Sequence, residues 1–199
     1  MNILGISCYY HDAAAALLQD GMLIAAAEEE RFSRVKHDSN FPKLSIEFCL
    51  RQAGITANDL DYVVYDEKPL VKFERILMTT LGQFPRSYPV FRESMMTWFN
   101  EKLWIKSQLQ NEVGVSPNKI LFIEHHLSHA ASALFASPFD EAAILTIDGV
   151  GEWTTATIGQ GTADWNRSNG EQRANKIDLI REVKFPHSLG LLYSAFTAW

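Results

Sequence analysis

The sequence lacks the features that mark several large classes of protein. Only two of its 199 residues are cysteines, Cys8 and Cys49, which excludes a fold held together by disulfides. No segment approaches the roughly 18 continuous apolar residues of a membrane-spanning helix. The N-terminal residues also lack the basic and apolar pattern of a secretory signal. We therefore expect a cytoplasmic protein with two reduced core thiols and no membrane partner.

Positive charge is scarce as well. The chain has 18 Lys and Arg against 24 Asp and Glu, a formal net charge of -6. This balance argues against a nucleic-acid partner, although a local basic cluster could still hold a small anion. The residues of that cluster are Arg31, Arg34, Lys36 and His37. A hydrophobic content of 47% is typical of a globular chain that buries a core.

Apolar runs separated by turns and amphipathic segments predict an α/β fold. A helix is expected over residues 42–53, because its apolar positions repeat at helical spacing and Gly54 follows. The sequence Gln19-Asp20-Gly21 predicts a tight turn between two strands. The predicted strands are residues 2–8, 13–18, 22–27, 62–65, 120–123, 142–147, 153–158 and 177–185.

Three segments differ in composition or pattern from the rest of the chain. Residues 68–113 are rich in large apolar side chains at helical spacing, which predicts a helical insertion that forms core or a subunit contact, as in a homodimer. Residues 159–175 are polar and are predicted to be a connector. The last predicted helix, residues 187–199, ends without a glycine stop or a polar tail, so we expect the chain to be the N-terminal piece of a longer protein.

The most informative segment contains three histidines and is followed later in the chain by an aspartate. On a helix beginning at His125, the side chains of His125 and His129 project from one face, four residues apart. Asp148 ends an apolar run and could supply a carboxylate, and two imidazoles with one carboxylate suit iron, manganese or zinc. The alternative is that both histidines are structural or surface residues. His126 points elsewhere on the helix and is predicted to play a supporting role.

Two polar loops follow apolar strands in the same manner. The first contains Tyr10, His11 and Asp12, and the second contains Gly149 and Gly151. Loops of this kind can hold a phosphate through backbone N–H groups, but these residues are also common in ordinary turns. The recurrence of strand, loop and strand suggests a duplicated architecture.

Five motifs in one order resemble the N-terminal part of the carbamoyltransferases of the nodulation and antibiotic-biosynthesis type. Together they extend over nearly the whole chain, apart from residues 68–113 and the segment near 160–175. The motifs are GISxxYHDAAA at 5–15, EEERFSRxKHD at 28–38, EHHLSHA at 124–130, LTIDGVGE at 145–152 and FPHSLGLLY at 185–193.

The resemblance implies the actin, sugar-kinase and heat-shock ATPase fold, which is ribonuclease H-like, with this chain as the first half of the duplicated domain. It implies transfer of a carbamoyl group to a hydroxyl of a small-molecule acceptor. The donor would be carbamoyl-adenylate, made from carbamoyl phosphate and ATP. The rest of the domain, a further aspartate ligand and a YrdC-like domain are expected beyond Trp199.

The resemblance also implies roles for single residues. His125, His129 and Asp148 look like metal ligands, with iron the common metal. His11 is a candidate for contacting the donor or taking the acceptor's proton, and Lys36 for balancing charge on the leaving phosphate. The candidate cofactor-binding residues are Tyr10, Asp12, Arg31, Gly149 and Gly151. The competing hypothesis is a non-enzymatic nucleotide- or partner-binding module of the actin or heat-shock type.

Overall fold

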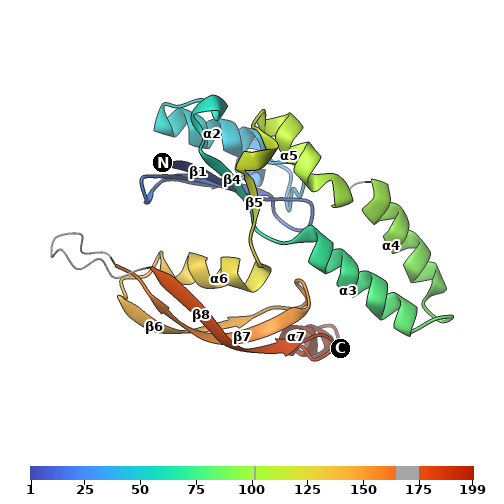
Figure 1. The fold of residues 1–199 in the computed structure, drawn as a ribbon. Coiled ribbons are helices and arrows are strands. Elements are labelled where there is room, and N and C mark those ends of the chain that lie inside the picture. Colours follow the sequence, from blue (N-terminus) through green and yellow to red (C-terminus); the bar gives the residue numbers. More distant parts are fainter. Residues whose placement is uncertain (101, 165–174) are drawn as a thin grey trace. The chain divides into compact units, whose positions relative to one another are not determined.

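A computed structural model describes residues 1–100, 102–164 and 175–199 of the chain. The chain divides into two compact units, Met1–Ile123 and Glu124–Trp199, and Figure 1 labels most of their helices and strands. Each unit is described by itself below.

The first unit is built on a five-stranded mixed sheet of order β3-β2-β1-β4-β5. Strand β2 pairs antiparallel with both β1 and β3, whereas β1, β4 and β5 pair in parallel. This order, with β2 alone antiparallel to its neighbours, is that of the ribonuclease H-like fold, so the predicted fold class is confirmed. The strands are β1 (Asn2–Ser7), β2 (Ala14–Gln19), β3 (Met22–Glu28), β4 (Tyr62–Tyr65) and β5 (Ile120–Phe122).

Local sequence explains how this sheet begins. Leu4, Ile6 and Ala15 are buried, in line with the period of two along a strand. Asp20 and Gly21 both have positive φ, 51° and 83°, as the predicted two-residue hairpin turn requires. Helix α2 (Lys43–Ala53) packs on β2 and β3 and ends at Gly54, which takes the left-handed conformation as predicted.

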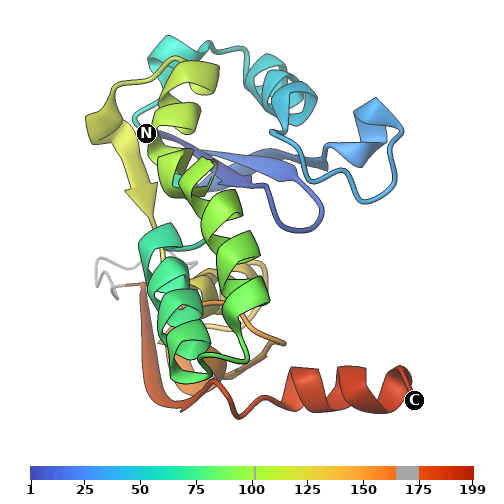
Figure 2. The ribbon, with the colours of Figure 1, turned by 90° about the vertical axis from the view of Figure 1, so that its right-hand side faces the viewer.

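The predicted helical stretch contains three helices, and they do not share one environment. They are α3 (Pro69–Gly82), α4 (Tyr88–Asn100) and α5 (Ile105–Val113), with a 3-10 turn over Lys102–Trp104. Helices α3 and α4 lie side by side in Figure 2 and contact each other. By contrast, Ile105, Leu109 and Val113 of α5 belong to the main core. Only the earlier part of the stretch therefore stands outside that core.

Short helical elements complete the first unit. Helix α1 is a single turn over Glu30–Ser33, within the charged segment that follows β3. A 3-10 turn over Ala57–Asp59 follows Gly54, and a similar turn over Pro117–Lys119 leads into β5.

The second unit is a three-stranded antiparallel sheet of order β6-β7-β8, with a helix on one face. The strands are β6 (Glu141–Ile147), β7 (Thr154–Thr162) and β8 (Lys176–Lys184), and α6 (His125–Leu134) packs on all three. Helix α7 (Leu189–Thr197) follows β8. This meander repeats the antiparallel plan of β1, β2 and β3, as the duplicated pattern of loops predicts.

The prediction of a polar connector over residues 159–175 is wrong for residues 159–162. Strand β7 continues through Thr162 and pairs with β6 and β8 along that stretch. Gly159 and Gly161 belong to the strand because close packing requires them. A β-carbon on Gly159 would lie 2.5 Å from the Asp178 carbonyl oxygen, and one on Gly161 would lie 2.4 Å from Leu134 Cδ2. Residues 165–174 of the predicted connector lie outside the described residues.

Candidate metal centre

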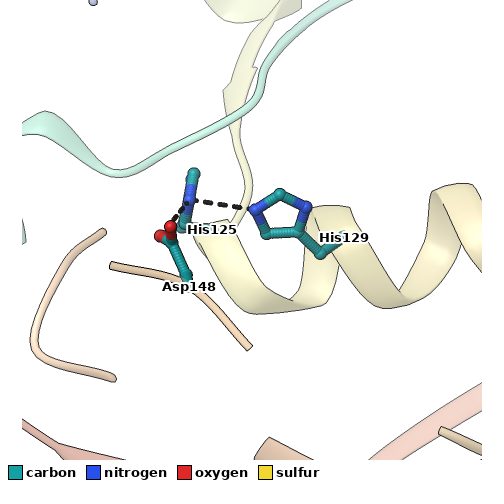
Figure 3. Close-up of side chains that lie close together, drawn as sticks. All are labelled: His125, His129 and Asp148. Atoms are coloured by element: carbon teal, nitrogen blue, oxygen red, sulfur yellow. Dashed lines mark hydrogen bonds and ion pairs between the residues drawn. The ribbon is translucent and has the colours of Figure 1, made fainter. Parts of the chain in front are cut away.

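The predicted ligand set comes together within the second unit. His125 Nε2 lies 3.0 Å from Asp148 Oδ2 and 3.1 Å from His129 Nε2. The two histidines start successive turns of α6, and Asp148 directly follows β6, so a helix and a strand end present the three side chains to one another (Figure 3). One ligand atom from each of the three residues lies within 4.8 Å of the others.

The donor chemistry of this cluster fits a bound cation. A ring nitrogen holds either a proton or a lone pair, so His125 Nε2 can donate to the Asp148 carboxylate or accept from His129 Nε2, but it cannot do both. Ligands at right angles on an ion about 2.1 Å away lie roughly 3.0 Å apart, which is close to both spacings. Two imidazoles and one carboxylate also form the donor set of non-haem iron sites. The residues present therefore fit a divalent metal.

The electrostatics of the cluster favour deprotonated ligands. The hydrogen bond from His125 lowers the pKa of Asp148 to about 2, and the backbone N–H of Gly149, 2.6 Å from Oδ1, acts in the same direction. Burial lowers the pKa of His129, and the neighbouring His125 lowers it further. A carboxylate and a neutral imidazole are the forms that bind metal.

The two glycines of the second loop have different surroundings. A β-carbon on Gly151 would lie 2.3 Å from His125 Cδ2 and 3.1 Å from Asp148 Oδ2, whereas one on Gly149 would meet nothing within 4 Å. Gly151 therefore leaves the space in which His125 and Asp148 meet. A β-carbon at residue 151 would collide with this cluster, whereas residue 149 has room for one.

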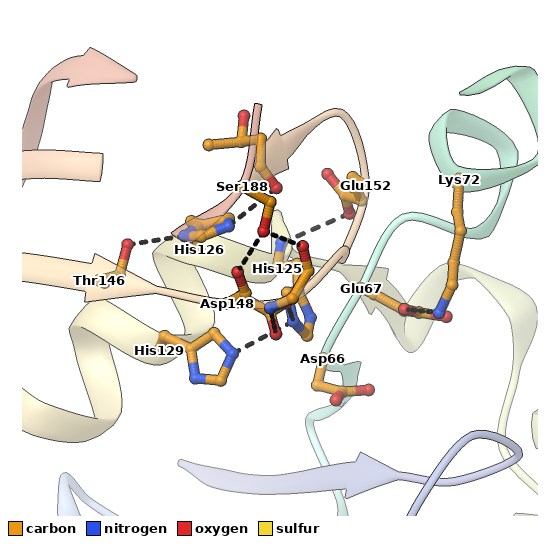
Figure 4. A network of polar contacts seen from close by, with 12 residues as sticks. Asp66, Glu67, Lys72, His125, His126, His129, Thr146, Asp148, Glu152 and Ser188 are labelled. Carbon is orange, nitrogen blue, oxygen red and sulfur yellow. Dashed lines mark hydrogen bonds and ion pairs between the residues drawn. The ribbon is translucent and has the colours of Figure 1, made fainter. Parts of the chain in front are cut away.

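Two residues of the last motif support the Asp148 loop, and the sequence did not single them out. The Ser188 hydroxyl lies 2.6 Å from the Gly149 carbonyl oxygen and 3.2 Å from that of Asp148, and it accepts the N–H of Leu191 as the cap of α7. Gly190 lies so close that a β-carbon would be 2.5 Å from the Asp148 carbonyl oxygen. Figure 4 shows Ser188 directed at this loop. The start of α7 thus holds the backbone that carries the carboxylate.

In the first unit, the loop after β1 is joined to the loop after α1. The N–H of Tyr9 donates to the Ser39 carbonyl oxygen and the N–H of Ala13 donates to that of Asp38, both at 2.7 Å. Asp12 Oδ1 lies 2.8 Å from His37 Nδ1, and this hydrogen bond lowers the pKa of Asp12. The sequence had placed both loops at a ligand site separately, without predicting that they bind each other.

Asp12, His37 and Glu30 form a second group whose potential ligand atoms lie within 4.8 Å. Glu30 Oε2 accepts the backbone N–H of His37 at 3.1 Å. Hydrogen bonds within the protein therefore account for this cluster.

The remaining candidate residues of the first unit are accessible. Tyr10, His11 and Lys36 are exposed, and the rings of Tyr10 and His11 lie 4.1 Å apart. Arg31 is also exposed and forms surface ion pairs with Glu28 at 3.3 Å and Glu30 at 3.8 Å.

A buried ion pair from the helical stretch adjoins the Tyr10 ring. Lys72 Nζ lies 2.7 Å from Glu67 Oε2, both side chains being at most 10% exposed (Figure 4). The same Nζ lies 4.1 Å from the centre of the Tyr10 ring, within cation–π range. No local sequence pattern predicted this ion pair, because Glu67 precedes α3 and Lys72 lies within the first turns of that helix.

Within residues 1–100, 102–164 and 175–199, no helix has both the length and the apolar character needed to cross a membrane.

Known proteins resemble this chain over nearly its full length. An uncharacterized Synechocystis protein is 51% identical over 98% of the chain, and the nodulation protein NolNO of Sinorhizobium fredii is 38% identical over 93%. The chain spans only 31% and 25% of these two relatives. Among solved structures, YeaZ from Pseudomonas aeruginosa has a TM-score of 0.39 at 13% identity, over 94% of this chain and 71% of that one.

The family comparison agrees with the motifs. Residues 2–199 match the family described as Carbamoyltransferase N-terminus, which includes both loops and the three clustered side chains. This chain therefore belongs to the carbamoyltransferase family, as an N-terminal domain of that family.

Proposed function

We propose that this chain is part of an enzyme that transfers a carbamoyl group to a hydroxyl of a small-molecule acceptor. The donor would be carbamoyl-adenylate, formed from carbamoyl phosphate and ATP. The observation that carries the proposal is the convergence of His125, His129 and Asp148, with 3.0 and 3.1 Å between ligand atoms, in a chain of this family. A nucleotide-binding module alone has no need of such a donor set.

Each of the candidate residues has a role in this proposal. His125, His129 and Asp148 would hold a divalent ion, with iron favoured over manganese or zinc. The bound ion would supply Lewis acidity that polarises the donor's carbonyl group. Lys36 would balance negative charge on the leaving AMP phosphate, and His11 would contact the donor or take the proton of the acceptor hydroxyl.

Other candidate residues would bind the donor or hold the loops in place. The proposed donor-binding residues are Tyr10, Asp12, Arg31, Gly149 and Gly151. Because the chain spans under a third of the length of these two relatives, we propose that a further aspartate ligand and a YrdC-like domain lie in the remainder of the protein.

Metal binding is tested first by anaerobic calorimetric titration of Fe(II), Mn(II) and Zn(II) into this chain. We expect one ion per chain, with binding lost in the His125→Ala/His129→Ala variant and kept in His11→Ala, whose side chain is outside the cluster. Equal binding by the double variant and the wild type would contradict the metal proposal.

Carbamoyl transfer is tested with the complete protein that contains this chain. It is incubated with carbamoyl phosphate labelled at carbon, ATP and a panel of sugar and antibiotic-type alcohols. We expect label in one acceptor class, and much less in Lys36→Ala and His11→Ala. Nucleotide binding without ATP-dependent transfer or hydrolysis of the label would favour the binding-module hypothesis instead.

A further inference from the structure

Helix α6 presents two adjacent rows of side chains. One row is His126, Ala130 and Leu134, the three buried residues of the helix. The other row is His125 and His129, which meet Asp148. Because both rows repeat every four residues, a rotation of the helix about its axis moves them together. Whatever fixes the buried row therefore also sets where the proposed ligands point.

The apolar part of the buried row specifies this rotation poorly. Ala130 and Leu134 pack with Ile144 and Ala163 in a small cluster. Apolar burial is non-directional, and Ala130 has little side chain to lock against its neighbours. His126 differs because a histidine opens this otherwise apolar row and its hydrogen bonds are directional.

Both ring nitrogens of His126 are hydrogen-bonded to the sheet. Nε2 lies 2.9 Å from the Thr154 carbonyl oxygen, which only accepts, so Nε2 carries the proton. In the neutral ring, Nδ1 then accepts the Thr146 hydroxyl at 2.6 Å. Thr146 in turn accepts the Thr157 hydroxyl at 2.5 Å. Each of these hydrogen bonds therefore has one donor and one acceptor: Thr157 donates to Thr146, Thr146 donates to His126 Nδ1, and His126 Nε2 donates to the Thr154 carbonyl oxygen.

Thr146 is two residues before Asp148 on the same chain segment. Side chains alternate along a strand, so the two residues project to the same side, toward α6. His126 bonds to Thr146 while His125 bonds to Asp148 (Figure 4). Two adjacent residues of α6 are thus paired with two alternate residues at the end of β6, Thr146 within the strand and Asp148 just after it.

We infer that His126 is a positioning residue, which through Thr146 and Thr154 sets the rotation of α6 at which His125 and His129 meet Asp148. This inference deepens the proposed function, because the three side chains it positions are the proposed metal ligands. His126 itself would bind neither metal nor substrate.

The test removes the Thr146 hydroxyl while keeping the size of the side chain. For Thr146→Val we expect the affinity for Fe(II) or Mn(II), measured by calorimetry, to fall about 10-fold or more, as for other partners that orient metal ligands. Thr146→Ser keeps the hydroxyl and is expected to restore most of the affinity. Thr162→Val, at the far end of β7, is the matched control. Wild-type affinity in a folded Thr146→Val variant would overturn the inference.

A metal-free readout separates this inference from the metal proposal. Long-range ¹H–¹⁵N spectra of the imidazole rings report tautomers and hydrogen bonds without any ion. We expect Thr146→Val to shift the signals of His125 and His129 as well as those of His126, and a change confined to His126 would overturn the inference. If the wild type binds no metal, the metal proposal fails, and the spectra alone then test whether His126 positions His125 and His129. If Thr146→Val does not fold, the comparison of Thr146→Ala with Thr146→Ser replaces it in both measurements.

Discussion

Gly151 lies against the ring of His125, so that a β-carbon at this glycine would be 2.3 Å from His125 Cδ2. Packed side chains do not approach so closely, and the ring would have to move. This movement would change the position of His125 Nε2, which now lies 3.0 Å from Asp148 Oδ2. The glycine therefore bears directly on the arrangement of the proposed ligands.

Gly151→Ala is expected to weaken metal binding by about 10-fold or more, because an imidazole displaced from its carboxylate partner no longer converges with it. Calorimetry with Fe(II) or Mn(II) measures the affinity. Gly149→Ala is the matched control for metal affinity and folding, since its added β-carbon meets nothing within 4 Å. Equal losses in the two variants would argue against this role for Gly151.

Glu29 is a buried carboxylate that caps a helix from a distance. Its oxygens accept the N–H groups of Leu44 at 3.0 Å and Ser45 at 2.8 Å, at the start of α2, and the Ser45 hydroxyl at 2.8 Å. Glu29→Ala should lower the free energy of unfolding by about 2–3 kcal/mol, because charge-assisted hydrogen bonds to buried donors are lost. Urea titration measures the change.

Glu28→Ala is the control for that experiment. Glu28 forms an exposed pair with Arg31 at 3.3 Å, and such pairs contribute little, so we expect a change below about 0.5 kcal/mol. Similar losses for the two glutamates would show that Glu29 does not stabilise α2 in this way.

The two cysteines predict a pH dependence of stability. Burial raises the pKa of the Cys8 and Cys49 thiols, so the folded chain keeps these protons at a pH where the unfolded chain releases them. Their contribution to stability is complete below the ordinary thiol pKa of about 8.5 and declines as the pH rises above it. Urea titrations between pH 7 and 10 should show this decline.

The Cys8→Ala/Cys49→Ala variant should show a smaller decline over the same range. A thiol reagent gives a second check at pH 8, where both thiols should react slowly in the native chain and rapidly in urea. Rapid labelling of the native chain would contradict their burial.

Backbone amides in the first loop should be protected although the loop is irregular. Tyr9 and Ala13 donate their N–H groups to Ser39 and Asp38 at 2.7 Å. In hydrogen exchange followed by NMR, we expect both amides to exchange much more slowly than in the unfolded chain. Asp12→Asn should speed exchange at Ala13 if the pairing of Asp12 with His37 helps to hold the two loops together. Exchange at unfolded-chain rates in the wild type would contradict the pairing of these loops.

Much of the fold follows from patterns within a few residues. Short apolar runs separated by turns predicted the strands, Asp20 and Gly21 predicted the hairpin turn, and Gly54 predicted the end of α2. The prediction failed at residues 159–162, where Gly159 and Gly161 are typical of a loop by composition. Their role in β7 depends on the Asp178 carbonyl and the Leu134 side chain, which approach only in the folded sheet.

The sequence by itself determined the local elements and the four-residue spacing of His125 and His129, because helix and strand periodicity depend on near neighbours along the chain. It also placed Asp148 at a strand end. Only the tertiary structure decided how these residues meet: His126 on Thr146, Glu29 on the start of α2, and Gly151 against His125. Such contacts join residues 15 or more positions apart, and they depend on strand register and helix rotation, which no short sequence pattern encodes.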